Sequence, residues 1–236
     1  MTREEELATN LKDVREKIAD ACERAGRDPQ EITLVAVTKT FPASDVRLLA
    51  GLGITEVAEN RDQEAGPKAA ECRDLPLNWH FVGRLQTNKV KSALKYAGVV
   101  HSVDRPKLVS ALSAEAVARG GPVEPVTCLV QVSLDPPEAD GRGGARPEDV
   151  PGIAAEIVEA PGLALGGIMA VAPLGEDPGP AFERLAELTK ELRAAHPDAT
   201  IMSAGMSGDL AEAIACGATH VRIGTALLGG RRAIVR

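Results

Sequence analysis

One lysine stands at the end of a short apolar run near the N-terminus. Leu34 to Val37 are all apolar, and the chain becomes polar at Thr38-Lys39-Thr40. An apolar run of this length favours a buried strand of a parallel sheet. A partly desolvated lysine at the mouth of a core favours its neutral amine, which is a nucleophile for aldehydes. The alternative for Lys39 is a solvated or ion-paired side chain, and the other strand ends must decide between the two.

Two turns near the C-terminus are typical of a phosphate site. The segment Ser203-Ala204-Gly205-Met206-Ser207-Gly208-Asp209 leads directly into a predicted helix, and Gly224-Thr225 follows the last predicted strand. Backbone N–H groups and hydroxyls that meet at the positive end of a helix bind anions. Ser207 or Asp209 alone could instead be a helix N-cap, a role that is compatible with phosphate binding.

A nucleophilic lysine and a phosphate site on one rim leave two kinds of ligand open. One is a phosphorylated sugar held as a Schiff base, as in class I aldolases. The other is pyridoxal 5'-phosphate (PLP), which carries both the aldehyde and the phosphate. Arg222, two residues before Gly224, is predicted to lie below the phosphate and toward a ring. A guanidinium stays protonated, so beside a pyridine nitrogen it would keep that nitrogen unprotonated and the ring a poor electron sink.

Alternating strands and helices are predicted to position these residues. An amphipathic helix over Glu4–Ala25 is expected to end at Gly26. Eight strand–helix units follow, which favour a closed (β/α)8 barrel whose C-terminal strand ends form one rim. A doubly wound open sheet is the alternative, although no Gly-x-Gly-x-x-Gly follows the first strand. The expected strands are Ile32–Thr38, Glu56–Ala58, Trp79–Val82, Val99–Val103, Pro125–Val132, Leu163–Ala170, Thr200–Met202 and His220–Ile223, with helices that include Thr87–Tyr96, Pro147–Glu159 and Pro180–Ala195.

Composition narrows the class of protein. The chain has 236 residues, of which 44% are hydrophobic, and its net charge is -7, which argues against a nucleic-acid partner. No apolar run is long enough to span a membrane. The 4 cysteines are far apart in the chain, and we expect reduced thiols in a cytoplasmic protein. The Gly- and Pro-rich loop Asp135–Arg146 is expected to be a functional lid or a disordered segment.

Several longer motifs carry a resemblance to one known family. They are Leu34-x-Ala36-Val37-Thr38-Lys39, Glu59-Asn60-x-x-Gln63-Glu64, Trp79–Lys89, His101-Ser102-Val103-Asp104, Gln131-Val132, Gly166–Pro173, Ser203–Asp209 and Val221–Thr225. On these motifs the chain, from about Leu7 to Arg231, resembles the pyridoxal phosphate homeostasis protein family.

The resemblance implies one barrel domain over residues 1–236, with a helix over 1–26 and a TIM barrel over 32–230. The barrel would be of the alanine racemase N-terminal type, PLP fold type III. The resemblance also implies a monomer that takes part in intracellular PLP homeostasis and supplies PLP to apo-enzymes. It implies that Lys39 forms the internal aldimine, Asn60 lies beside the ring, Arg222 faces the pyridine nitrogen, and Ser203, the Met206 N–H, Ser207, Gly224 and Thr225 hold the phosphate.

A PLP-dependent amino-acid racemase is the alternative to a carrier. Such an enzyme needs a second proton-transfer group opposite the lysine, which in alanine racemases is a tyrosine from a C-terminal β-domain. We expect this domain to be absent, and Tyr96, the only tyrosine, is predicted to lie far from the rim. His80 and His101 are conceivable substitutes, but a histidine near a strand is more often a hydrogen-bonded core residue. We therefore favour the carrier.

Overall fold

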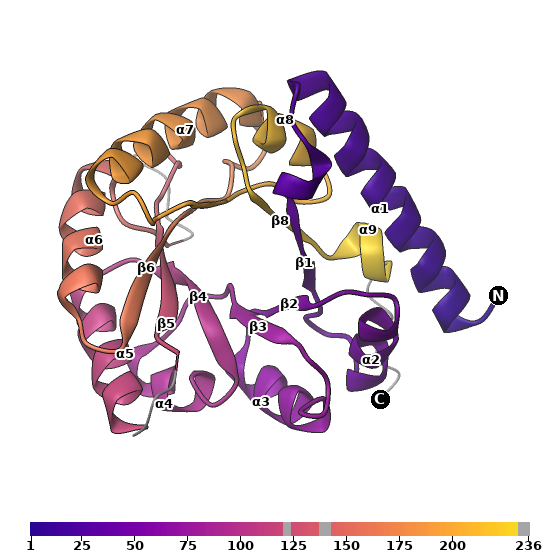
Figure 1. Ribbon diagram of the computed structural model, residues 1–236, viewed down its shortest axis with the longest axis horizontal. Helices are drawn as coiled ribbons and strands as arrows, with labels where there is room; N and C mark the ends of the chain where they lie inside the picture. Colours follow the sequence, from indigo (N-terminus) through magenta and orange to yellow (C-terminus); the bar gives the residue numbers. More distant parts are fainter. Residues whose placement is uncertain (120–123, 137–142, 231–236) are drawn as a thin grey trace.

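A computed structural model describes residues 1–119, 124–136 and 143–230, and in it eight parallel strands close into a barrel in chain order (Figure 1). Strand β1 pairs with β8, with Leu34 opposite Val221, and this pairing closes the ring. The predicted (β/α)8 barrel is confirmed and the open sheet is excluded. The strands are β1 Thr33–Val37, β2 Glu56–Glu59, β3 Asn78–Phe81, β4 Ala97–Val103, β5 Val126–Gln131, β6 Leu163–Met169, β7 Ile201–Ser203 and β8 His220–Ile223.

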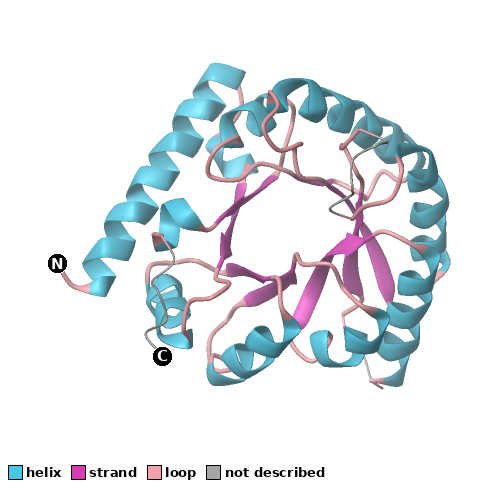
Figure 2. Ribbon diagram, turned by 180° about the vertical axis from the view of Figure 1, so that it is seen from behind, coloured by secondary structure: helices cyan, strands magenta, loops and turns pink. Residues whose placement is uncertain are grey.

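Helices form the outer layer around the strands (Figure 2). None of those in the described ranges has the length and apolar character that crossing a bilayer requires. The helices are α1 Arg3–Ala25, α2 Ala43–Gly51, α3 Asp62–Glu71, α4 Val90–Ala93, α5 Pro106–Ala118, α6 Val150–Glu159, α7 Pro178–Ala195, α8 Leu210–Ala215 and α9 Thr225–Leu228, with 3-10 turns η1 Pro29–Glu31, η2 Thr87–Lys89 and η3 Pro147–Asp149.

The apolar core lies between the strands and the helices. Trp79 and Phe81, which alternate with His80 along β3, are buried in the two large clusters of this layer. A much smaller apolar cluster consists of Val35, Val37 and Ala58, with the partly buried Val82 packed against it. Since side chains alternate between the outside and the inside of a barrel strand, we place this small cluster inside the barrel. Several of the other inward positions carry polar side chains, which the candidate site depends on.

Helix α1 lies outside the ring, where it packs against α8 and α9 (Figure 1). It begins at a capping box, in which Thr2 and Glu5 exchange hydrogen bonds, and ends at Gly26 as predicted, with φ 65°. The Arg3 guanidinium donates to Asp45 Oδ2 at 2.6 Å and to the Leu228 carbonyl at 2.9 Å. The Asn10 amide donates to the Leu227 carbonyl at 3.0 Å. These bonds fix α9, which follows the last strand.

Some predicted helix boundaries are wrong. The helix predicted over Thr87–Tyr96 is only a 3-10 turn and a short α4, because the chain finishes in i to i−3 hydrogen bonds such as Tyr96 N–H to Ala93 O before entering β4. The segment predicted as a helix from Pro147 starts as η3 and becomes α-helical at Val150. Helix α7 starts at Pro178, since Asp177 accepts from Gly179 N–H at 3.0 Å.

The sequence also predicted reduced cysteines and a long functional or disordered loop. All 4 cysteines are free, as predicted, and Cys22, Cys72 and Cys128 are buried. Burial raises the pKa of the Cys128 thiol to about 12. Of the predicted loop Asp135–Arg146, residues 137–142 lie outside the described residues.

Candidate functional site

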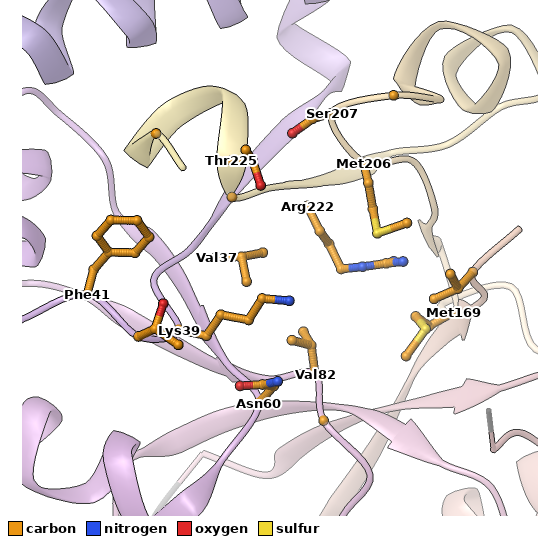
Figure 3. Close-up of a pocket in the computed structure, with 16 residues that line it drawn as sticks. Val37, Lys39, Phe41, Asn60, Val82, Met169, Met206, Ser207, Arg222 and Thr225 are labelled. Carbon is orange, nitrogen blue, oxygen red and sulfur yellow. The ribbon is translucent and has the colours of Figure 1, made fainter. Parts of the chain in front are cut away.

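A cavity of about 450 Å³ opens at the C-terminal ends of the strands (Figure 3). This is the rim where barrel enzymes carry their sites, and the volume is within the usual range for small ligands. Seven of the eight predicted site residues line it: Lys39, Asn60, Met206, Ser207, Arg222, Gly224 and Thr225. The others that line it are Val37, Thr40, Phe41, Val82, Gly83, Met169, Val171, Gly208 and Gly229.

Lys39 reaches into the cavity from the end of β1 (Figure 3). Its side chain is exposed, whereas the preceding Thr38 is fully buried. The next residue, Thr40, has φ 68°, a left-handed conformation that is rare for a β-branched residue. Phe41 N–H donates to the Thr38 carbonyl at 3.1 Å, which closes this turn. The backbone therefore turns sharply around Lys39, and the lysine is held at the rim.

A buried ion pair beneath the rim anchors Lys39 and Asn60 through their neighbours. Lys68 Nζ lies 2.5 Å from Glu59 Oε1 and donates to the Thr38 carbonyl at 2.8 Å. The Thr38 hydroxyl donates to Glu59 Oε1 at 2.6 Å. Glu59 is 0% and Lys68 7% exposed. Burial raises the pKa of Glu59 above its ordinary value, although Lys68 and Thr38 oppose the shift. The pair links β1, β2 and α3 on the outer side of the strands, next to the rim.

Asn60 lies against a glycine on the next strand end. A Cβ placed on Gly83 would lie 2.1 Å from Asn60 O and 2.7 Å from Asn60 C. Only a residue without a side chain permits this approach of the two backbones. Gly83 thus determines where Asn60 sits beside Lys39 and Val82, as Figure 3 shows for the three labelled side chains.

Gly83→Ala is expected to disturb the cavity. Because the added methyl group would overlap backbone atoms, we expect a loss of about 1–3 kcal/mol in the free energy of unfolding and weaker ligand binding. Denaturant unfolding measures the first effect. Gly51→Ala is the matched control, since a Cβ there meets nothing within 4 Å. Equal stability of Gly83→Ala and the wild type would contradict this account.

The opposite side of the cavity is formed by the turns that follow β7 and β8. Ser207 and Thr225 lie there with their hydroxyls near each other (Figure 3). Ala226 N–H donates to Ser207 Oγ at 3.3 Å, so the turn after β7 is joined to the start of α9. Met206 N–H donates to Asp209 Oδ1 at 2.5 Å. Asp209 is the N-cap residue of α8, but its carboxylate makes no capping bond to that helix.

Arg222 extends from β8 into the floor of the cavity (Figure 3). It is 5% exposed. Nη1 donates to the carbonyl and the hydroxyl of Ser203, each at 2.7 Å, and Nη2 donates to the Ala170 carbonyl at 2.8 Å. Burial lowers the pKa of Arg222 to about 10, against an opposing effect of Asp209. The guanidinium remains charged near neutral pH and is held in one orientation by its bonds to Ser203 of β7 and to Ala170, which follows β6.

Ser203 is the predicted site residue that is not brought to the cavity. It is 0% exposed, and its hydroxyl lies between Arg222 Nη1 and His101 Nδ1, the latter at 3.0 Å. The difference from Ser207 arises because Ser203 is still within β7 and faces the barrel interior, whereas Ser207 belongs to the turn beyond the strand.

Tyr96 and the two histidines lie away from the cavity lining. The Tyr96 ring meets Trp79 edge-on, with centroids 6.2 Å apart. His80 and His101 are 2% and 0% exposed and bonded to each other, with Nδ1 of His80 2.7 Å from Nε2 of His101. The prediction that they are hydrogen-bonded core residues is confirmed.

Comparison with known proteins identifies the family. The alanine racemase N-terminal domain matches residues 8–232. A pyridoxal phosphate homeostasis protein of Mycobacterium tuberculosis is 44% identical over 249 aligned residues, covering 98% of this chain and 95% of the relative. The one of Escherichia coli K12 is 34% identical over 232 residues, covering 96% and 97%. The chain belongs to the pyridoxal phosphate homeostasis protein family.

Solved structures agree with membership of the pyridoxal phosphate homeostasis family. PipY of Synechococcus elongatus PCC7942, with PLP bound, superposes with a TM-score of 0.80 at 32% identity, covering 94% of this chain and 100% of that chain. Alanine racemase of Clostridium difficile 630 superposes with a TM-score of 0.70 at 15% identity, and 56% of its length is covered, which shows the fold alone. The predicted family and barrel type are confirmed.

Sequence reasoning missed part of the cavity lining. Phe41, Val171 and Gly229 come from loops with no polar group to mark them. Position was the available signal for Phe41, since it follows the Lys39 turn directly. For Gly229, with φ 87°, the signal was the Gly229-Gly230 pair that ends the last helix. Within the described residues, no group of three His, Cys, Asp or Glu side chains could hold a metal ion.

Proposed function

We propose that this chain binds PLP in the rim cavity and takes part in intracellular PLP homeostasis. The observation that carries the proposal is the convergence of three groups on one cavity: the Lys39 amine, the Ser207 and Thr225 hydroxyls, and the Arg222 guanidinium. They match the aldehyde, the phosphate and the ring nitrogen of PLP. The PLP-bound PipY relative supports the same ligand.

The lining residues divide into three roles. Lys39 Nζ condenses with the aldehyde as a Schiff base and releases water, so the ligand is held covalently but reversibly. Ser207, Gly224, Thr225 and the Met206 N–H bind the phosphate; the Met206 N–H would then share its bond to Asp209 with the anion. Asn60 and Val82 contact the ring and limit the space around it. We assign Ser203 to holding Arg222, because its hydroxyl is already bonded to that guanidinium.

Arg222 is proposed to face the pyridine nitrogen. Its guanidinium is charged and can only donate hydrogen bonds. A donor there keeps the ring nitrogen unprotonated, and an unprotonated ring withdraws electrons poorly. This arrangement suits storage of PLP better than amino-acid chemistry.

We propose a carrier rather than a racemase. Lys39 is the acid–base side chain of the described lining, which otherwise holds no histidine, tyrosine, cysteine or carboxylate. The curated relatives are named homeostasis proteins, not enzymes. The proposed recipients are apo forms of PLP-dependent enzymes in the cytoplasm, and the proposed carrier is a monomer.

Transfer of PLP to an apo-enzyme tests this function. The purified protein loaded with PLP is mixed with an apo-enzyme, and the recovery of its activity is followed. We expect recovery faster than spontaneous release of PLP into a trap allows. Transfer no faster than spontaneous release, together with robust racemisation of an amino acid, would establish the racemase instead.

A further inference from the structure

A chain of hydrogen bonds crosses the barrel interior beneath the cavity. From Arg222 it passes through Ser203 Oγ at 2.7 Å to His101 Nδ1 at 3.0 Å. His101 Nε2 then lies 2.7 Å from His80 Nδ1, and His80 Nε2 lies 2.6 Å from Glu56 Oε2. These residues belong to β8, β7, β4, β3 and β2. Glu56 is the first residue of β2, so this series of hydrogen bonds ends at the face of the barrel opposite the cavity.

The two ends of the chain determine the direction of every bond. Arg222 can only donate, so the Ser203 hydroxyl accepts from it and has its own proton left for His101 Nδ1. His101 then carries its proton on Nε2 and donates to His80 Nδ1. His80 in turn donates from Nε2 to the Glu56 carboxylate, which can only accept. The reverse order needs an extra proton on Glu56 or His80 and leaves the Ser203 O–H without its acceptor.

The charges along the chain agree with this direction. Burial raises the pKa of Glu56, but hydrogen bonds with His80, Asn78 and Thr55 outweigh it and leave the pKa below its ordinary value. Burial lowers the pKa of His101 well below its ordinary value, and His80, Arg222 and His220 add to the shift. Glu56 is 23% exposed and lines a second cavity, of about 440 Å³, at the opposite face. Its charge is therefore solvated while His101 stays neutral.

Arg222 depends on its hydrogen-bond acceptors for stabilisation, because it is a buried cation without a carboxylate in contact. Among the described residues no acidic group lies within ion-pair distance of it, and its direct acceptors are two carbonyls and one hydroxyl. Each donor in the chain polarises the next acceptor, so the hydroxyl that receives Arg222 is a stronger acceptor than an isolated serine.

We propose that Glu56, His80, His101 and Ser203 are positioning residues, which orient the Arg222 guanidinium toward the ligand through one directional hydrogen-bond chain. The part of this proposal that concerns the ligand rests on the proposed function, in which the cavity binds PLP. The chain is not a proton conduit, because a protonated guanidinium at its upper end has no lone pair to accept a proton. What the chain transmits is orientation, from the solvated carboxylate to the floor of the cavity.

Histidine tautomers in the PLP-free full-length protein test the direction. Nitrogen-15 NMR of the imidazoles is expected to show His101 and His80 each protonated on Nε2 and bare on Nδ1. A proton on Nδ1 of His101 in the PLP-free protein near neutral pH would overturn the proposal. This readout needs no PLP, so it stands even if PLP binding itself fails.

Ser203→Ala tests the coupling to Arg222. We expect faster rotation of the Arg222 guanidinium in nitrogen-15 spectra of the PLP-free protein and, as for a lost hydrogen bond to a charged group, PLP binding weakened by about tenfold. Ser203→Thr retains a hydroxyl and should restore both. Ser102→Ala is the matched control, since Ser102 Oγ is buried with no partner among the described residues. An unchanged Arg222 rotation in Ser203→Ala, or the same change in Ser102→Ala, would overturn the proposal, whatever the PLP affinities are.

Discussion

Lys39→Ala is expected to abolish covalent attachment of PLP while leaving the fold intact. The amine of Lys39 is the nucleophile of the described cavity lining, and its side chain is exposed, so its removal creates no void in the core. Treatment with PLP and borohydride, followed by peptide mass spectrometry, should locate the adduct on Lys39 in the wild type. The variant should lose the Schiff-base absorbance and the adduct, with unchanged unfolding by denaturant.

Lys91→Ala is the control for Lys39→Ala, because Lys91 is an exposed lysine that does not line the cavity. It should retain the adduct in full. A Lys39→Ala protein that still forms one stoichiometric adduct after reduction would move the site to another amine. Residual non-covalent PLP binding in this variant is compatible with the proposal, since the phosphate contacts and Arg222 remain.

Lys68→Met is expected to cause the largest loss of stability. The substitution leaves Glu59, which is 0% exposed, without its cation, while Glu59 Oε2 already has no hydrogen-bond partner among the described residues. Breaking one partner of a buried ion pair costs about 3–5 kcal/mol. Urea unfolding measures the change. We also expect weaker PLP binding, because Lys68 bonds the carbonyl of the residue that precedes Lys39.

The pH dependence of Lys68→Met follows from the same carboxyl group. Burial raises the pKa of Glu59, and loss of Lys68 raises it further. A carboxyl whose pKa is raised by folding contributes stability at low pH that is lost as the pH rises through its folded value. The deficit of the variant should therefore grow from acid toward neutral pH. Adding Glu59→Gln removes the buried charge and should recover a large part of the stability; no recovery in the double variant would contradict the ion-pair explanation.

The cavity is thus supported by two polar systems that share β2, one between the strands and α3 and the other inside the barrel. The ion pair of Glu59 and Lys68 supports the side of the cavity with Lys39 and Asn60. The hydrogen-bond chain that starts at Glu56 supports Arg222. Asn10 and Arg3 of α1 fix the third side by bonding to the carbonyls of α9. A ligand that binds here meets groups whose orientation is set before it arrives, which lowers the entropy lost on binding.

Local patterns in the sequence were sufficient to predict the barrel and most of the residues that line the cavity. The apolar run before Lys39, the turns around Ser207 and Thr225, and the repeated strand–helix units each depend on neighbours in the chain. The parallel barrel then brings all strand ends to one rim, whatever the connecting helices contain. Errors such as the overlong helix before Tyr96 arose where a turn ends a helix without a glycine or proline to mark it.

Only the tertiary structure decided which polar residues line the cavity and which support the lining residues through hydrogen bonds. Ser203 and Ser207 are four residues apart and equally plausible as phosphate ligands in the sequence, but strand register turns Ser203 inward. Glu56, His80 and His101 look unrelated in the sequence, and the partner of Glu59 could have been any nearby cation. Contacts between strands depend on the register and shear of the closed barrel, which arise from packing of the whole chain and not from local pattern.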